Sequence, residues 1–299
     1  MITVLGSIGF DLTTISDRLP SPGETLVGTG FVSGPGGKGA NQALAARRAG
    51  AVTRMVGAVG RDAFAPQALE LLKSSGVDLS KVEARDAPTG IALIFVGGTG
   101  ENMIVIAQGA NAMVTSQQAG AAPLAQGDHL LLQLEVPIET VASGIMQAQG
   151  VDAVSILNTA PFNPAAASLM MDADISIANE TEFDLACEAL RLEGADRKAR
   201  MAEFVQRSGK TIIVTLGGDG AVAATREGFI SVPALKIKPV DTVGAGDTFC
   251  GYFGAALDAG LDLETAMRRA SAAGSLACLR PGAQPAIPDK AEVDAALAG

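Results

Sequence analysis

The stretch Asp241-Thr242-Val243-Gly244-Ala245-Gly246-Asp247-Thr248-Phe249 joins a glycine-rich turn directly to a helix. The helix is amphipathic, and its apolar positions are Phe249, Tyr252, Phe253, Ala256 and Leu257. Glycines at a helix start let a ligand approach the backbone closely. The first-turn N–H groups, which lack helical partners, form a site for an anion. Gly244, Ala245 and Gly246 are therefore candidates for holding the negative charge of a phosphoryl group.

Asp247 lies in the same first turn, where the helix dipole favours an ionised carboxylate. A carboxylate beside an anion site is suited to accept a proton from a hydroxyl nucleophile during phosphoryl transfer. The competing interpretation is structural, because an aspartate at this position can simply cap the helix. We predict that Asp247 is a catalytic base and that Gly244, Ala245 and Gly246 form its anion hole.

The rest of the chain alternates short apolar runs with segments of helical periodicity. We expect strands at Ile2–Leu5, Val52–Val56, His129–Leu134, Val154–Asn158, Ile175–Ala178 and Thr211–Thr215. We expect helices at Lys38–Ala49, Phe64–Ser75, Ile138–Gln149, Thr181–Leu190, Asp262–Leu279 and Asp289–Leu297. This alternation predicts a single α/β domain over residues 1–299, in which helices cover both faces of a mostly parallel sheet.

Two stretches interrupt the alternation. Thr13–Ser33 is punctuated by Pro and Gly, with extended pieces at Thr25–Val27 and Gly30–Val32. Gly90–Gln108 has the pattern of a β-hairpin, and its first strand, Ile91–Val96, is apolar on both faces. An exposed hairpin would not tolerate that pattern. Either one face covers a ligand site while the other meets a second subunit, or the strand is buried within its own chain.

The composition limits the classes of function. The 299 residues carry a formal net charge of −10, no Trp and one Tyr, which disfavours a nucleic-acid partner. The three widely spaced cysteines, Cys187, Cys250 and Cys278, favour a reducing cytoplasm over a disulfide framework. His129 is the only histidine, so a multi-histidine metal centre is excluded. With no charged leader and no apolar run of membrane-spanning length, we expect a cytoplasmic protein without a membrane partner.

The segment Gly34-Pro35-Gly36-Gly37-Lys38-Gly39-Ala40-Asn41-Gln42 matches the G-x-G-x-x-G pattern of dinucleotide sites. Its position argues against that use, because the fingerprint should follow the first strand, whereas this segment comes after a long irregular stretch. It is not a P-loop, since Gly39 rather than Ser or Thr follows Lys38. The alternative is a polar cradle in which backbone N–H groups, Lys38 and Asn41 bind several hydroxyls. Asp11, just past the first strand, could join them.

Two further segments follow predicted strands. Asn179-Glu180-Thr181-Glu182 opens a helix, and a capping box is its simpler interpretation. The functional interpretation is that Glu182 organises water around a magnesium ion. Thr215-Leu216-Gly217-Gly218-Asp219-Gly220 places small residues at the carboxyl end of a strand, where ligands of open α/β sheets bind, although a plain turn also explains it.

Three segments, Gly36–Asn41, Asn179–Glu182 and Asp241–Phe249, occur in the order that is typical of the ribokinase (PfkB) family of carbohydrate kinases. The chain resembles that family over nearly its whole length, and the further matching segments are Thr89–Val96, Gln133–Glu135, Thr215–Gly217 and Gly282–Pro285. The resemblance implies a three-layer α/β domain with a small β-sheet lid, formed by about residues 12–34 and 90–108. It also implies that ATP phosphorylates a primary hydroxyl of a pentose, D-ribose first among them.

The resemblance assigns roles residue by residue, with Asp247 as base and Gly244, Ala245 and Gly246 as anion hole. The positions that match sugar contacts are Gly9, Asp11, Gly37, Lys38, Gly39, Asn41, Glu135 and Asp247. The positions that match ATP contacts are Asn179, Thr215, Gly217, Gly220, Gly246 and Ser271. Glu182 would act through Mg²⁺. The positions that match a monovalent-cation site, usually K⁺, are Asp241, Val243, Ala277, Arg280, Gly282 and Ala286.

Three residues depart from the family pattern. Gly9 replaces a common Asn and so removes one hydrogen-bond partner for a sugar hydroxyl. The identity of the sugar substrate is therefore left open. Ser271 replaces an Asn near the adenine, and Ala286 replaces a frequent Ser of the cation loop. The resemblance further implies a homodimer formed through the lids. The alternatives are a family activity on a keto-sugar, a keto-sugar acid or a nucleoside, an oxidoreductase that uses Gly34–Gly39, and a non-catalytic sugar-binding module.

Overall fold

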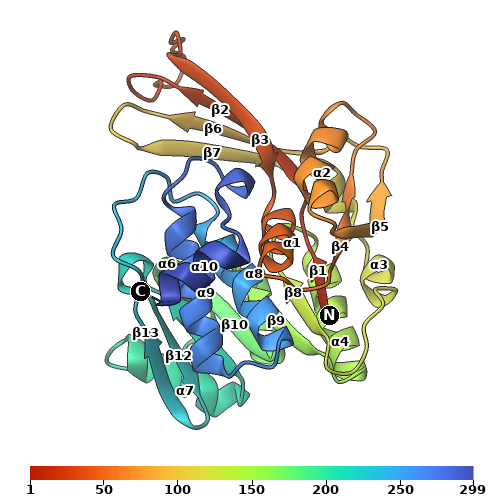
Figure 1. The fold of residues 1–299 in the computed structure, drawn as a ribbon, viewed down its shortest axis with the longest axis vertical. Coiled ribbons are helices and arrows are strands. Elements are labelled where there is room, and N and C mark those ends of the chain that lie inside the picture. Colours follow the sequence, from red (N-terminus) through yellow and green to blue (C-terminus); the bar gives the residue numbers. More distant parts are fainter. Residues whose placement is uncertain (299) are drawn as a thin grey trace.

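The short apolar runs of the sequence form one large sheet. In the computed structural model, which describes residues 1–298, its strands are β1 (Ile2–Leu5), β4 (Thr53–Val59), β5 (Asp78–Ala84), β8 (His129–Leu132), β9 (Val154–Asn158), β10 (Ile175–Asn179), β11 (Thr211–Thr215), β12 (Ala221–Thr225) and β13 (Gly228–Val232). Their spatial order is β13-β12-β11-β10-β9-β8-β1-β4-β5 (Figure 1). Neighbours are parallel except for the antiparallel pairs β11–β12 and β12–β13.

Helices cover both faces of this sheet. They are α1 (Lys38–Arg48), α2 (Phe64–Ser74), α3 (Ser116–Gly120), α4 (Ile138–Gly150), α5 (Leu169–Asp172), α6 (Glu180–Leu190), α7 (Arg197–Ser208), α8 (Ala245–Asp258), α9 (Leu263–Ala277) and α10 (Lys290–Ala298). One apolar core joins the sheet to α1, α2 and α8 to α10, and a second joins it to α3 to α7. The predicted three-layer α/β fold is confirmed. Within residues 1–298, no helix is both long and apolar enough to cross a bilayer.

The strand boundaries differ from the predictions where apolar residues do not pair with a neighbouring strand, or where paired residues are not apolar. The strand predicted over His129–Leu134 ends at Leu132, and Leu134 N–H instead bonds to the Ala160 carbonyl at 3.1 Å. The predicted extended piece Thr25–Val27 pairs with no strand. The edge strand β5 was not predicted, because its exposed sequence Asp78–Ala84 lacks a buried apolar face.

The order of the strands reverses between β1 and β8. The chain runs from β1 outward to β4 on one side and later returns to β8 on the other, so this pair is the topological switch point. Leu5 pairs with Leu132, which brings the segment after β1 next to the segment after β8. A Cβ at Gly6 would lie 1.9 Å from Gln133 Oε1, so a side chain there would have to displace the Gln133 amide.

The two irregular stretches of the sequence form a second, small sheet, which stands at one end of the main body (Figure 1). Its strands, in spatial order, are β3 (Gly30–Gly36), β2 (Gly9–Ile15), β6 (Gly90–Val96) and β7 (Asn102–Ala107). β2 and β3 extend to Gly9 and Gly36, beyond the predicted stretch 12–34. Gly34–Gly39 thus runs from the small sheet into α1 and does not follow a strand of the large sheet, which excludes the dinucleotide fingerprint.

Helices α1 and α8 pack closely against each other. Gly251 of α8 makes this possible, because a Cβ there would lie 2.5 Å from both the Gln42 carbonyl oxygen and Ala45 Cβ of α1. The contact also aligns the first turns of the two helices. As a result, the side chains of Asn41 and Gln42 reach the first turn of α8.

We predict that Gly251→Ala lowers the free energy of unfolding by about 1–3 kcal/mol, the usual cost of overpacking a core. The same change should also disturb the contacts of Asn41 and Gln42 with Asp247, since it moves α1 away from α8. Gly150→Ala is the matched control, because no atom lies within 4 Å of a Cβ at that helical glycine. Urea unfolding of both variants checks the prediction, and equal midpoints would contradict it.

Candidate active site

The first turn of α8 offers free backbone donors. Gly244, the N-cap, has a φ of 75°, a left-handed conformation that glycine adopts readily. Ala245 N–H donates to the Thr242 carbonyl at 3.3 Å. Within residues 1–298, the N–H groups of Gly246 and Asp247 have no acceptor. In the predicted hole of Gly244, Ala245 and Gly246, the Ala245 amide is therefore already engaged, whereas the Asp247 amide is available.

The carboxylate of Asp247 is held on both oxygens by side chains of α1. Asn41 Nδ2 donates to Oδ2 at 2.9 Å, and Gln42 Nε2 donates to Oδ1 at 3.1 Å. Asp247 is only 6% exposed, so it is largely removed from water. The buried Asn41 Oδ1 has no partner among the described residues. An unpaired buried acceptor is costly, so this oxygen is well suited to receive a ligand hydroxyl.

Glu135 joins the switch point of the sheet to the start of α1. Its Oε2 accepts hydrogen bonds from Ser7 Oγ and from Lys38 N–H, the latter at 3.0 Å. Gly39 N–H in turn donates to Ser7 Oγ at 3.3 Å, and a Cβ at Gly39 would lie 2.6 Å from Ser7 N. The predicted residues Lys38, Gly39 and Glu135 thus lie together, and they are joined by Ser7, which no sequence motif marked.

Charged side chains converge on the same place. Burial, followed by the charges of Glu135 and Asp247, raises the pKa of Asp11 to about 7, with Lys38 opposing the shift. The charge of Asp247, followed by those of Glu135 and Glu182, raises the pKa of Lys38 although burial opposes it. Lys38 therefore keeps its positive charge among these carboxylates. Such a group can neutralise phosphoryl charge.

The backbone of the small sheet adds to the group of polar side chains around Lys38, Asn41 and Glu135, which we call the cradle. The carboxylate of Asp11 folds over Gly36, where a Cβ would lie 2.3 Å from Oδ1. Gly37 has a φ of 87°, and a Cβ there would lie 2.7 Å from Gly9 N. Gly9 is paired with Gly36 and Gly90 and offers the cradle only its backbone. The predicted sugar-contact residues are thus brought together by β2, β3, α1, α8 and the segment after β8.

A cavity of about 450 Å³ opens on the other side of the α8 first turn. Its walls come from the end of β11, the 234–239 segment, α8 and α9, and five predicted nucleotide residues line it: Thr215, Gly217, Gly220, Gly246 and Ser271. Asn179 is not in this lining, although it pairs with Thr215 at the adjacent strand end. Lys236 and Thr242 also line the cavity; Thr242 lies in the Asp241–Phe249 segment without a predicted role, and no motif marks Lys236.

Glu182 and Asn179 form the capping box that the sequence predicts. Asn179 Oδ1 accepts from Glu182 N–H at 2.8 Å, and Glu182 Oε2 accepts from Asn179 N–H at 2.9 Å. Thr159 Oγ1 also donates to Oε2, at 3.4 Å. No hydrogen bond within residues 1–298 reaches Oε1 of Glu182, so that oxygen is free to bind water.

Asp241 joins the two loops that contain the predicted cation residues. It accepts the N–H groups of Val243 at 3.0 Å and of Gly282 at 2.8 Å. The side chain of Arg280 pairs with Glu292. No group of three His, Cys, Asp or Glu residues in the described chain is arranged to hold a metal ion. A cation at these loops would therefore depend mainly on backbone carbonyls, the ligands that K⁺ accepts.

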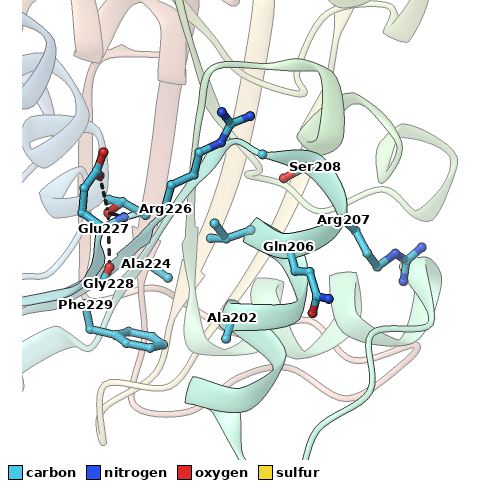
Figure 2. A pocket seen from close by; sticks show the side chains of 12 residues that line it. Ala202, Gln206, Arg207, Ser208, Ala224, Arg226, Glu227, Gly228 and Phe229 are labelled. Carbon is cyan, nitrogen blue, oxygen red and sulfur yellow. Dashed lines mark hydrogen bonds between the residues drawn. The ribbon is translucent and has the colours of Figure 1, made fainter.

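A larger, open hollow of about 690 Å³ lies between α7 and the β12–β13 hairpin (Figure 2). No residue predicted for the site lines it. Figure 2 shows the guanidinium groups of Arg207 and Arg226 extending away from each other, so they do not form one anion site. Thr225 Oγ1 bonds to Glu227 at 2.9 Å and to the Gly228 carbonyl at 3.3 Å, which holds the hairpin turn. We assign the hollow no function.

A polar cradle around Lys38 and Asn41 and a cavity beside Gly246 adjoin the first turn of α8, an arrangement expected of a kinase for a small hydroxylated molecule. Residues 1–290 match the pfkB family of carbohydrate kinases. The chain belongs to this family and is a carbohydrate kinase.

The family assignment has support from individual relatives. The chain is 36% identical over 299 residues to a ribokinase of Bacillus subtilis, covering 99% of each protein. The crystal structure of a ribokinase from Thermotoga maritima superimposes with a TM-score of 0.90 at 32% identity, covering 100% of this chain and 99% of that one. The structure of an Arabidopsis thaliana ribokinase complexed with ribose and ATP has a TM-score of 0.86 at 29% identity, with coverages of 99% and 98%.

The raised pKa of Asp11 makes stability depend on pH. Between about pH 4 and 7 the folded protein retains a proton that the unfolded chain has released, so this carboxyl lowers the stability as the pH rises through that window. We predict that Asp11→Asn stabilises the free protein more at about pH 8 than at about pH 4. It should also weaken sugar binding about 10-fold or more, the usual effect of losing a charged hydrogen-bond partner.

Urea unfolding at the two pH values and calorimetric titration with sugar check these effects. A stability difference that is the same at both pH values would show that Asp11 does not hold the extra proton.

Proposed function

We propose that the protein transfers the γ-phosphoryl group of Mg-ATP to the primary hydroxyl of D-ribose. The observation that carries the proposal is the position of Asp247, which lies between the cradle around Lys38 and the cavity beside Gly246. The ribokinase relatives, one of them complexed with ribose and ATP, support ribose as the acceptor. Gly9, in place of the usual Asn, leaves the other family sugars as alternatives.

In this mechanism Asp247 accepts the proton of the sugar hydroxyl while the oxygen attacks the γ-phosphorus. The new O–P bond forms as the bond from the γ-phosphorus to the bridging oxygen breaks, and ADP leaves. The free N–H groups of Gly246 and Asp247 are placed to stabilise the charge on the transferring group. Asp11, Asn41 and Glu135 would hold the remaining hydroxyls, which fixes the direction of attack.

The cation sites belong to the same proposal. Glu182, through the free Oε1 and an intervening water, would hold Mg²⁺, which would neutralise the charge of the phosphates. Asn179 would contact ATP at the adjacent strand end, where it pairs with Thr215. The loops tied by Asp241 would enclose K⁺. The candidate positions for K⁺ are Asp241, Val243, Ala277, Arg280, Gly282 and Ala286.

We further propose that the small sheet is a lid and that it pairs with the lid of a second copy. The face of the sheet that carries Asp11 turns toward the cradle. The opposite face exposes apolar side chains, namely Phe31, Leu93, Phe95, Met103 and Val105. An apolar face of this kind is typical of a subunit interface. Dimerisation would cover it without blocking the site.

An ATP-consumption screen over pentoses, keto-sugars, keto-sugar acids and nucleosides tests the function, with wild type and Asp247→Asn in parallel. We predict the highest kcat/KM with D-ribose and a higher rate in KCl than in NaCl. Asp247→Asn should bind ribose but lose about 10²–10⁴-fold in kcat, the usual contribution of a general base.

Several outcomes would count against these assignments. If Asp247→Asn turned over at the wild-type rate, the assignment of Asp247 as the base would be wrong. If another substrate gave a higher kcat/KM than D-ribose, the assignment of D-ribose as the substrate would be wrong. Equal rates in KCl and NaCl would contradict the proposed K⁺ site.

Val105→Glu tests the lid interface, because a carboxylate on the outer apolar face should prevent the two lids from pairing. We predict a dimer for the wild type and a monomer for the variant, measured by light scattering after gel filtration. Met146→Glu is the matched control, since Met146 is an exposed apolar residue of α4 on the main body. A monomeric wild type, or a Val105→Glu dimer, would contradict the interface.

A further inference from the structure

The side-chain amide of Gln42 is wholly buried and fully hydrogen-bonded. Its Nε2 donates to Asp247 Oδ1 at 3.1 Å and to Asn158 Oδ1 at 3.2 Å, and its Oε1 accepts from Gln133 Nε2 at 2.7 Å. These three partners come from α8, from the end of β9 and from the segment after β8. Gln42 therefore connects the carboxylate of Asp247 to two strand ends of the large sheet.

Two neighbours determine which end of the Gln42 amide faces Asp247. Asn158 Nδ2 donates to the backbone carbonyl of Ile177 at 3.3 Å, so the Oδ1 of Asn158 is the end turned toward Gln42. Gln133 presents a donor on the opposite side. Only one orientation of the Gln42 amide satisfies both neighbours, and in it the NH₂ group points at Asp247. The reverse orientation would set the Gln42 oxygen against the oxygens of Asn158 and Asp247, and its NH₂ group against the NH₂ group of Gln133.

Gln133 lies at the switch point, and its Oε1 has no hydrogen-bond partner among the described residues. It is completely buried, and it lies against Gly6, where a Cβ would be 1.9 Å from its Oε1. A side chain at position 6 would therefore displace Gln133. The hydrogen-bonded chain from Gln133 through Gln42 to Asp247 thus begins at the carboxyl ends of β1 and β8, where the two halves of the sheet meet.

We propose that Gln42 is a positioning residue for Asp247, oriented by Gln133 and Asn158; this role rests on the proposed function of Asp247 as base. A carboxylate turns about a single bond, and one donor on each oxygen fixes its plane. Asn41 supplies the donor on Oδ2 and Gln42 the donor on Oδ1.

None of the other charged and titratable groups around Asp247 hydrogen-bonds to the side chain of Gln42. They come from α1, β2, the segment after β8, α6 and α8 itself, and they are Lys38, Asp11, Glu135, Glu182 and Cys250. A change in pH dependence on substitution of Gln42 can therefore be assigned to the lost amide.

Gln42→Met removes the donor and keeps the length of the side chain. We predict that the acidic limb of the kcat/KM profile moves to higher pH by about one pH unit, and that kcat at neutral pH falls about 10-fold, as expected for one hydrogen bond to a charged group. The KM for the sugar should change less than about 3-fold, because Gln42 makes no hydroxyl contact in this account. Activity should recover toward wild type as the pH is raised.

Gln118→Met is the matched control, since Gln118 is a buried glutamine that donates to the Gly57 carbonyl at 2.9 Å, away from the site. It should lose stability without a change in the pH profile. Asp247→Asn is assayed beside both. If Asp247→Asn is inactive while Gln42→Met matches wild type in kcat and pH profile, the positioning role is wrong and the proposed function stands. An active Asp247→Asn would instead overturn the proposed function.

If Gln42→Met does not fold, Gln133→Met carries the test, because Gln133 does not touch Asp247. It should shift the acidic limb in the same direction by a smaller amount, since the Gln42 amide is then free to turn. An unchanged profile for a folded Gln133→Met would overturn the proposal.

Discussion

The close contact between α1 and α8 is the constraint on which the rest of the site depends. Gly251 lets the helices approach until the Gln42 carbonyl and Ala45 of α1 touch α8. At that separation two adjacent amides of α1 can hold the two oxygens of one carboxylate in the first turn of α8. A wider spacing would leave Asp247 buried without donors, which is costly for a charged group. The packing of α1 against α8 and the hydrogen bonding of Asp247 therefore require the same short distance between these two helices.

The placement of Asp247 also explains how two ligands meet. The helix start faces the cradle of α1 and the small sheet on one side and the 450 Å³ cavity on the other. The cradle is built at the switch point of the large sheet, and the cavity at the end of β11. Both lie at carboxyl ends of parallel strands, where α/β sheets bind their ligands. In the proposed reaction this one helix start would be the junction between the sugar hydroxyl and the phosphate.

Much of this arrangement could be predicted from the sequence, because it depends on local patterns. The alternation of apolar runs with helical segments predicted the three layers, and the glycine-rich turn before Asp247 predicted where α8 begins. The hydroxyl cradle could be predicted at Lys38 and Asn41, but the residues that orient the base could not. Gln42 and Gln133 have no motif of their own, and their roles come from strand order and from the contact between α1 and α8. Lys236 likewise reaches the cavity only through the folded path of the 234–239 segment.

The central claim is that Asp247 receives a proton from a sugar hydroxyl beside free amides of α8. A crystal structure of the protein with D-ribose and a non-hydrolysable ATP analogue tests it most directly. The account predicts the primary hydroxyl within hydrogen-bonding distance of Asp247, at about 2.6–3.2 Å, with the terminal phosphate facing the N–H groups of Gly246 and Asp247. A sugar whose hydroxyls all lie beyond that reach, or a terminal phosphate held elsewhere, would contradict it.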